Sequence, residues 1–382
     1  DVSAFTYLED GAIVIDGGTI LSVGDFAALL PEDRQAAEVI DHRPHLMMPG
    51  FIDAHLHFPQ MHAVGSWGKQ LLDWLNTYTF PQEARFADRA HADRMAAWFL
   101  DQLISCGTTT VAAYCSVHKA SAEALFTAAL ARSYRLISGK VLMDRNAPAA
   151  VLDTPQTGYD ETKSLIGTWH GKGRIDYAIT PRFAITSTPE QMKVVETLIQ
   201  EHPDCYVQTH LDENRDEIDL TARLYPTARD YLDIYESHGM LGPRSLFGHC
   251  IHLTDRERVA MAQSGSVAVF CPTSNLFLGS GLFDDATMRS AGVRCAIATD
   301  VGGGTDYSML RTLDEAYKVL QLQGSNLDPY RAFYWLTLGN AKALSKAHQI
   351  GTLQPGSDAD IVVLNSRATA VMEMRMETVT SL

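Results

Sequence analysis

The sequence predicts an α/β fold in which a (β/α)8 barrel of the TIM type carries a small β-sandwich built from both ends of the chain. Short apolar or β-branched runs recur eight times between residues 48 and 346, and segments with helical periodicity separate them. This alternation is typical of a parallel sheet, and eight strands favour a closed barrel over an open sheet. Further β-rich segments predict a second, smaller domain from residues 1–47 and 347–382.

Composition and charge exclude several classes of protein. The chain has 382 residues, of which 46% are hydrophobic and 20% charged, as in ordinary globular proteins. A formal net charge of -15 repels polyphosphate, so we expect no nucleic-acid partner. Asp101 and Asp300 interrupt the most apolar regions, and no run reaches the roughly 18 apolar residues of a membrane helix. The first residues also lack the basic and apolar regions of a signal peptide, which predicts a cytoplasmic protein.

The smaller domain is predicted from one β-rich segment near each end of the chain. Residues 11–23 contain two apolar runs on either side of Asp16-Gly17-Gly18, a sequence typical of a tight hairpin. Residues 350–365 contain a turn at Pro355-Gly356 and then the apolar run Ile361–Leu364. Neither segment has enough apolar mass to fold alone, so we expect the two to share one small sheet domain.

Eight apolar runs are interpreted as the barrel strands. They are Gly50–His57, Thr108–Tyr114, Arg135–Met143, Ile175–Phe183, Cys205–Asp212, Ser245–Ile251, Ser266–Pro272 and Val293–Asp300. Helical periodicity is found in the segments between them, at His91–Ser105, Ser121–Arg132, Pro189–Glu201, Arg256–Gln263 and Leu310–Gln323. The third of these helices follows Ser187-Thr188, residues that commonly precede a helix.

The end of the first predicted strand carries a pair of histidines. Active sites of this barrel lie at the carboxyl ends of the strands, and this strand ends in Asp53-Ala54-His55-Leu56-His57. Period-two alternation places both imidazoles on one face, about 6 to 7 Å apart. They can share one ion, because each zinc–nitrogen bond is about 2.0 to 2.1 Å long. The pair by itself is also compatible with ordinary surface histidines.

Two further strand ends complete a candidate metal site. The fifth strand ends in Thr209-His210-Leu211-Asp212-Glu213 and the eighth in Thr299-Asp300. Taken singly, His210 is compatible with a core histidine, Glu213 with a solvated residue of a first helical turn and Asp300 with a helix cap. Three histidines and an aspartate at one rim of a barrel instead predict a mononuclear metal site with room for water. These ligands fit zinc or iron(II), and the general affinity order favours zinc.

A fourth histidine, His249, ends the sixth predicted strand at the same rim. It is compatible with a fifth metal ligand. A hydrogen bond from His249 to bound hydroxide or to substrate is the interpretation that we favour.

The strand-end motifs resemble those of the amidohydrolase superfamily. The resemblance rests on Pro49–His57, Thr209–Glu213, Gly248-His249 and Thr299-Asp300, and PGSDADIVVLN is similar to the C-terminal sandwich segment of that superfamily. Within the superfamily, further segments resemble the guanine deaminase family. These are His57–Gln60, Leu72–Pro81, Thr180–Phe183, Glu213–Glu217 and Asp300–Gly304, of which LLDWLNTYTFP and TPRF are the discriminating ones.

The resemblance implies hydrolysis of guanine to xanthine and ammonia with one zinc ion per chain. It implies that His55, His57, His210 and Asp300 are the ligands and that Glu213 is the proton shuttle. It also implies substrate contacts at Gln60, Arg182, Phe183 and the neighbourhood of Glu213. Small differences at Phe58-Pro59 and Leu211-Asp212 fall on variable positions of the motifs.

The chemistry of the residues supports this assignment. Hydrolytic deamination needs a nucleophile at neutral pH, and zinc lowers the pKa of bound water to about 7. It also needs a carboxylate such as Glu213 to move protons, with His249 and Asp300 beside it as further catalytic groups. Binuclear relatives commonly carry a bridging lysine at the end of strand 4, but residues 178–182 contain none, which favours a single metal.

Four side chains are candidates for binding the base. The planar guanidinium of Arg182 can reach two acceptors on guanine, although a salt bridge at a strand end is the ordinary alternative. Gln60 offers both a donor and an acceptor, as does a purine edge. Phe183 and Trp74 can cover the base, with a purely structural role as the alternative for Trp74.

Two other functions are compatible with these motifs. One is a related mononuclear amidohydrolase that acts on an adenine derivative, cytosine or an s-triazine. The other is a non-catalytic scaffold of the same fold, although all four expected ligands and Glu213 are present. For the partners, we expect a small-molecule substrate and a homodimer, with no nucleic acid and no membrane.

Overall fold

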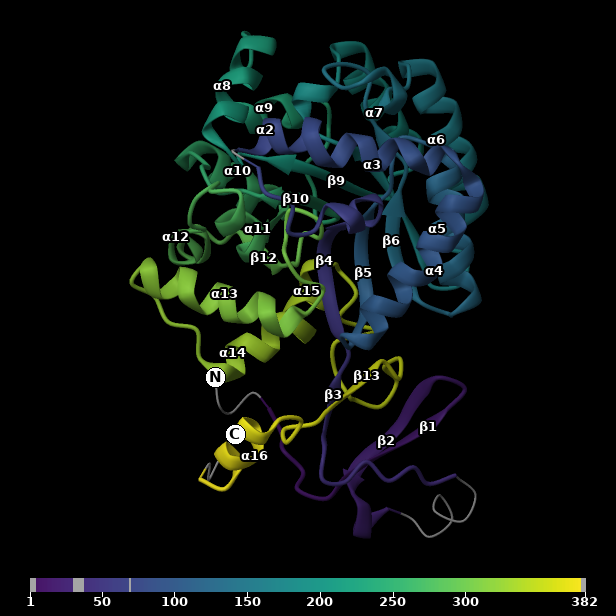
Figure 1. The fold of residues 1–382 in the computed structure, drawn as a ribbon, viewed down its shortest axis with the longest axis vertical. Coiled ribbons are helices and arrows are strands. Elements are labelled where there is room, and N and C mark those ends of the chain that lie inside the picture. Colours follow the sequence, from purple (N-terminus) through teal and green to yellow (C-terminus); the bar gives the residue numbers. More distant parts are fainter. Residues whose placement is uncertain (1–4, 30–37, 69, 379–382) are drawn as a thin grey trace.

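The computed structural model describes residues 5–29, 38–68 and 70–378. Its largest unit is a parallel sheet that bends into a nearly closed barrel surrounded by helices (Figure 1). The strands pair in the order β4, β5, β6, β8, β9, β10, β11 and β12, and the short β7 pairs with β8. Their bounds are β4 (Phe51–His57), β5 (Thr108–Tyr114), β6 (Arg135–Gly139), β7 (Val141–Leu142), β8 (Ile175–Pro181), β9 (Tyr206–Leu211), β10 (Ser245–His249), β11 (Val267–Phe270) and β12 (Arg294–Ile297).

Seven of the eight predicted runs contain one barrel strand each, and the run Arg135–Met143 contains both β6 and β7. The strands are covered on both faces. In β4, for example, all seven residues are buried, although successive side chains point to opposite faces of the sheet. Such strands are recognisable as nearly continuous apolar runs. The predicted (β/α)8 barrel of the TIM type is therefore confirmed.

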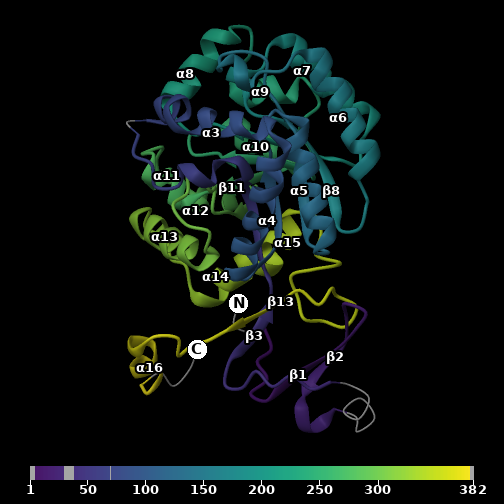
Figure 2. The same ribbon diagram turned by 45° about the vertical axis from the view of Figure 1, so that its right-hand side comes forward.

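Helices cover the outside of the barrel (Figure 2). The five predicted helical segments correspond to α4 (Arg89–Ser105), α5 (Lys119–Ala131), α7 (Pro189–Glu201), α10 (Asp255–Ser264) and α13 (Met309–Leu322). The others are α2 (Leu71–Trp74), α3 (Phe80–Ala84), α6 (Pro155–Trp169), α8 (Arg215–Leu224), α9 (Tyr231–Glu236), α11 (Pro272–Phe277), α12 (Asp285–Ser290), α14 (Pro329–Tyr334), α15 (Asn340–Ala343) and α16 (Ala370–Met376). None of the helices in the described ranges is long and apolar enough to cross a membrane.

The first and last barrel strands are joined largely by side chains, at a contact that we call the barrel seam. The buried Asn340 donates from Nδ2 to the carbonyls of Ile52, at 2.7 Å, and Ile297, at 2.8 Å. Its Oδ1 accepts from the Ile297 amide at 2.9 Å. Closer to the rim, Asp53 accepts hydrogen bonds from the Thr299 amide and hydroxyl. The seam thus holds β4 beside β12 with hydrogen bonds that are shielded from water.

The barrel interior is apolar at the end where the strands begin. Tyr206, Leu246 and Val267 pack there against Leu344 and Ile350, which follow the last barrel strand. The Tyr206 hydroxyl donates to the Leu344 carbonyl at 2.5 Å. This packing closes one end of the barrel, so the functional side chains gather at the opposite rim.

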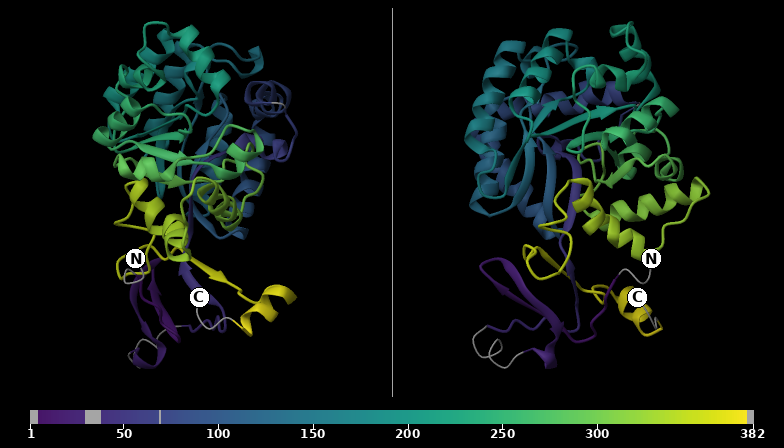
Figure 3. Two further views of the ribbon diagram at one scale, coloured as in Figure 1. Left: turned by 90° about the vertical axis from the view of Figure 1, so that its left-hand side faces the viewer. Right: turned by 180° about the vertical axis from the view of Figure 1, so that it is seen from behind.

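The remaining strands lie together at the end of the molecule opposite α8 and α9 (Figure 3). Strands β1 (Gly11–Asp16) and β2 (Thr19–Asp25) form the expected hairpin, with positive φ angles at the two turn glycines. Strand β3 (Leu46–Pro49) pairs with β13 (Ile361–Leu364), so segments near both ends of the chain share one sheet. The two pairs are separate two-stranded sheets, connected by a bridge between residues 19 and 358. Strand β3 extends across the predicted domain boundary at residue 47. The limits of the two domains stay a prediction.

Candidate active site

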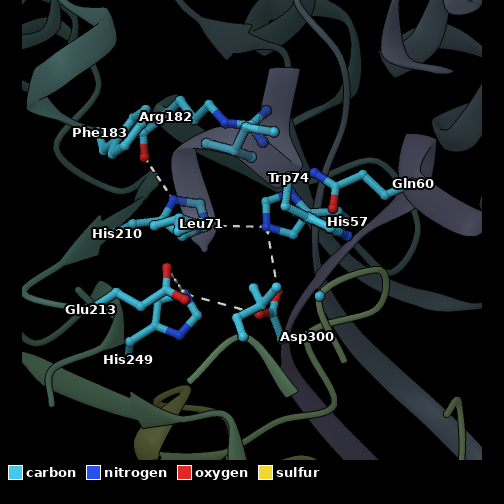
Figure 4. A pocket seen from close by; sticks show the side chains of 13 residues that line it. His57, Gln60, Leu71, Trp74, Arg182, Phe183, His210, Glu213, His249 and Asp300 are labelled. Atoms are coloured by element: carbon cyan, nitrogen blue, oxygen red, sulfur yellow. Dashed lines mark hydrogen bonds and ion pairs between the residues drawn. The ribbon is translucent and has the colours of Figure 1, made fainter. Parts of the chain in front are cut away.

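A cavity lined by 13 residues opens at the carboxyl-terminal rim of the barrel (Figure 4). The predicted site residues that line it are His57, Gln60, Trp74, Arg182, Phe183, His210, Glu213, His249 and Asp300. His55 is 1% exposed and contacts the rings of the other three histidines. The structure therefore brings together all ten side chains that the sequence predicted for the site.

The four predicted metal ligands converge at one point of the cavity. Asp300 Oδ1 lies 3.4 Å from His55 Nε2 and 3.5 Å from His57 Nε2. His57 Nε2 lies in turn 3.1 Å from His210 Nε2. These ligand atoms come from β4, β9 and the segment that follows β12, so the geometry depends on the closed barrel.

Burial favours the neutral form of three of the histidines, and the neutral imidazole is the form that binds metal. Burial lowers the pKa of His57, His210 and His249 well below the ordinary value, and neighbouring imidazoles lower it further. His210 Nδ1 donates to the Arg182 carbonyl at 2.7 Å, which leaves the lone pair of Nε2 facing the site. The buried His55 Nε2 has no hydrogen-bond partner among the described residues. A metal ion would satisfy both nitrogens.

His249 is held differently from the other histidines. In the amide orientation present, Asn275 Nδ2 donates to His249 Nδ1 at 3.0 Å. The proton of the neutral ring then lies on Nε2, which is 3.3 Å from Glu213 Oε2 and 3.9 Å from Asp300 Oδ2. With the amide in this orientation His249 can donate a hydrogen bond from Nε2, and it also lies within ligand distance of His55 and His210.

Glu213 has the surroundings of a group that exchanges protons. It is 3% exposed, and its Oε1 accepts from the Ser280 hydroxyl at 2.9 Å. Burial, followed by the negative charges of Glu217 and Asp300, raises the pKa of Glu213 well above its ordinary value. A carboxyl group with a raised pKa can both take up and release a proton near neutral pH.

The strand ends at this rim carry unusual backbone conformations. Asp212, His249, Cys250 and Asp300 have positive φ angles, between 49° and 72°, which are uncommon for residues with a side chain. Such conformations often cluster at active sites, where the surrounding fold maintains them. Gly248 is required for another reason, because a Cβ atom there would lie 2.6 Å from His55 Cε1.

The far side of the cavity presents Arg182 and Gln60, opposite Glu213, His249 and Asp300 (Figure 4). Arg182 is 3% exposed, and its Nη1 donates to both oxygens of Glu83, at 2.8 and 2.9 Å. Gln60 Nε2 donates to Glu83 Oε1 at 2.8 Å. Part of the guanidinium fork that the sequence offered to substrate is therefore occupied by Glu83.

Apolar side chains complete the walls of the cavity. Trp74 is 2% exposed, and its Nε1 donates to the Ser66 carbonyl at 2.9 Å, so the indole is firmly placed. Phe183 lies across the cavity wall with its ring centroid 6.2 Å from that of His210. Leu71, Leu75 and Leu278 line the remaining surface. Apolar walls of this kind suit an aromatic ring.

Sequence reasoning missed several residues of the site. Glu83 was not predicted, although it lies two residues beyond the segment Leu72–Pro81 that contains Trp74. Asn275 and Ser280 follow the seventh strand. No residue after that strand was predicted for the site, although active sites of this barrel lie at the carboxyl ends of the strands. Cys271, which was not predicted as a ligand, lies within ligand distance of His55 and Asp300.

A family model for amidohydrolases, described as "Amidohydrolase family", matches residues 46–380. The chain belongs to the amidohydrolase family. The membership expected from the strand-end motifs is thereby confirmed. Guanine deaminase of Escherichia coli is 46% identical to this amidohydrolase over 380 residues, which are 100% of this chain and 87% of the relative. A probable guanine deaminase of Deinococcus radiodurans is 41% identical over 376 residues, 97% of this chain and 86% of the relative.

Solved structures give the same picture of this amidohydrolase. The structure of E. coli guanine deaminase matches with a TM-score of 0.97 at 45% identity, covering 100% of this chain and 88% of that one. Guanine deaminase from Clostridium acetobutylicum, solved with guanine bound in its active site, matches with a TM-score of 0.89 at 30% identity. That match covers 96% of this chain and 88% of the other. The expected resemblance to guanine deaminases extends over the whole fold.

Proposed function

We propose that this amidohydrolase is a guanine deaminase that hydrolyses guanine to xanthine and ammonia with one zinc ion per chain. The observation that carries the proposal is the arrangement of the cavity. The four candidate ligands and Glu213 lie on one side of the cavity. On the other side are Arg182 and Gln60, two buried side chains that can form hydrogen bonds with a substrate. The identity of 46% with E. coli guanine deaminase supports the same substrate.

His55, His57, His210 and Asp300 would hold the metal ion. Three neutral imidazoles and one carboxylate suit zinc, and the unpartnered His55 Nε2 fits a ligand role. When bound there, zinc lowers the pKa of a water molecule to about 7 and so supplies a nucleophile at neutral pH. A single ion is supported by the end of β8, where residues 178–182 contain no lysine to bridge two metals. The nearby Lys140 is instead paired with Asp153 at 2.5 Å.

Glu213 would move the protons of the reaction. The water oxygen forms a bond to the purine carbon that carries the amino group, and Glu213 transfers a proton from the water to the adjacent ring nitrogen. Glu213 then transfers the second proton to the amine, the C–N bond breaks and ammonia leaves. His249 would donate a hydrogen bond from Nε2 to the attacking oxygen. Asp300 Oδ2 would accept a hydrogen bond from that same oxygen.

Arg182 and Gln60 would recognise the base. The guanidinium keeps its Nε and Nη2 donors beyond the contacts of Nη1 with Glu83, and these suit the carbonyl oxygen of guanine. Gln60 would bind a polar edge of the purine, while Phe183 and Trp74 cover its faces.

The decisive experiment measures xanthine formation from guanine by absorbance, together with zinc content by elemental analysis. We expect turnover of guanine and about one zinc per chain. Adenine, cytosine and ammeline are tested in parallel. Turnover of one of these in place of guanine would support the related amidohydrolase activity, and an inactive protein without metal would support a scaffold.

Two further expectations belong to the proposal. We propose a cytoplasmic location and a homodimer, and sedimentation analysis of the purified protein tests the second.

A further inference from the structure

Glu83 contacts both residues that face the proposed substrate, yet it lies outside the cavity. Its carboxylate is 1% exposed and accepts three hydrogen bonds, two from Arg182 Nη1 and one from Gln60 Nε2. The cavity is lined by Gln60 and Arg182 but not by Glu83. Glu83 therefore stands behind the two side chains and acts on a ligand only through them.

Helix α3, which carries Glu83, contacts the Arg182 guanidinium through two side chains. Phe80 and Glu83 are three residues apart on α3, so both side chains lie on one face of that helix. The guanidinium carbon of Arg182 lies 5.2 Å from the centroid of the Phe80 ring, while Glu83 binds Nη1. A ring face and a carboxylate from the same helical turn thus fix the position of the guanidinium.

The contact with Glu83 also decides which way the Gln60 amide faces. An ionised carboxylate only accepts hydrogen bonds, so the NH2 group of the amide must point at Glu83. A reversed amide would place two oxygens against each other. Gln60 Oε1 therefore points away from Glu83, and the Gly302 amide donates to it at 3.4 Å.

We propose that Glu83 is a specificity-determining positioning residue, which fixes Gln60 as an acceptor and Arg182 as a charge-neutralised donor. The proposal rests on the guanine deaminase function proposed above. Guanine has a carbonyl acceptor next to N–H donors, so it matches a template with fixed donors and a fixed acceptor. Adenine has an amino group in place of the carbonyl and does not match. Without Glu83, the Gln60 amide can reverse and the guanidinium can move.

The test replaces Glu83 by glutamine, which is similar in size but uncharged. For Glu83→Gln we expect kcat/KM for guanine to fall about 10²-fold, mostly through KM, because the binding groups lose their alignment. The ratio of guanine to adenine turnover is expected to fall as well, and zinc content to stay unchanged. Glu83→Asp keeps the charge and is expected to recover part of the loss.

A control separates positioning from general damage to a buried ion pair. Asp285 is 2% exposed, binds Arg331 through both oxygens at 2.7 Å and does not line the cavity. Asp285→Asn is expected to lower stability but to leave KM and the ratio of guanine to adenine turnover at the values of the parent.

A double-mutant cycle tests whether Glu83 acts through Arg182. If it does, the loss in Glu83→Gln combined with Arg182→Met is smaller than the product of the two single losses, and the loss that Glu83→Gln still adds is the part that acts through Gln60. Losses that multiply, or a Glu83→Gln protein with unchanged KM and selectivity, would overturn the inference while the parent still deaminates guanine. A parent that does not deaminate guanine would instead contradict the proposed function.

Discussion

His57 and His210 face each other with their Nε2 atoms 3.1 Å apart, at the point where Asp300 Oδ1 also lies close. Because His210 donates from Nδ1 to the Arg182 carbonyl, its Nε2 carries a lone pair and no proton. Burial favours the neutral form of both rings. Such a group of lone pairs is stabilised by a cation, which is the basis of the first prediction.

His210→Ala is expected to lose zinc and activity together, because it removes one of four ligands and opens the site to water. Elemental analysis and the guanine assay measure the two losses. The matched control is His170→Ala, since His170 belongs to another group of possible ligands with Asp204 and Cys205. The Tyr177 amide donates to His170 Nδ1, so the ring proton lies on Nε2 and faces Asp204. This variant should keep its zinc, and two metals per chain at full activity would contradict the single-ion proposal.

Glu213→Gln is expected to retain zinc but to lose roughly 10²-fold to 10⁴-fold in kcat, the usual contribution of a positioned acid–base group. Glutamine can still accept from Ser280 but cannot carry a proton between water and purine. Steady-state assays with metal analysis of the same sample measure the effect. A variant as active as the parent would show that another group moves the protons.

Arg182→Met is expected to depress kcat/KM for guanine sharply without changing zinc content. The parent should prefer guanine over adenine by at least about 10³-fold, because the buried donors would face an amino group of adenine. Competition assays with both purines measure this preference. Comparable turnover of adenine by the parent would contradict the assignment of guanine as the substrate and would support only the broader class of deaminases.

Asn340→Ala tests the barrel seam. The change leaves the Ile52 carbonyl and both backbone groups of Ile297 without their partner. Buried unpaired groups cost about 1–3 kcal/mol each, so we expect the free energy of unfolding to fall by about 3 kcal/mol or more. The denaturant midpoint measures the loss. Asn76 also donates to a backbone carbonyl, at 2.8 Å, but is exposed, and Asn76→Ala should change stability by less than about 0.5 kcal/mol.

The fold could be predicted because barrel strands are apolar on both faces and end at a common rim. The same rule located the metal-binding candidates and Glu213, each of which lies at or directly after the end of a predicted strand. Glu83 escaped it because it lies on a helix beyond the first strand, separated in sequence by 23 residues from Gln60 and by 99 from Arg182. No local pattern indicates such a contact. The position of the His249 ring proton was equally hidden, since it depends on Asn275, a residue of helix α11 that follows the next strand.

The barrel seam also bears on how the enzyme matures. At the rim, the Asp300 amide donates to the His55 carbonyl and the His57 amide donates to the Val301 carbonyl. The candidate ligands from the first and last strands are thus tied to each other's backbone. A growing polypeptide cannot make these bonds until the barrel sequence has emerged almost completely, so the full set of four candidate ligands forms only at that stage. An ion bound across the seam would then lock it, because its binding free energy opposes reopening.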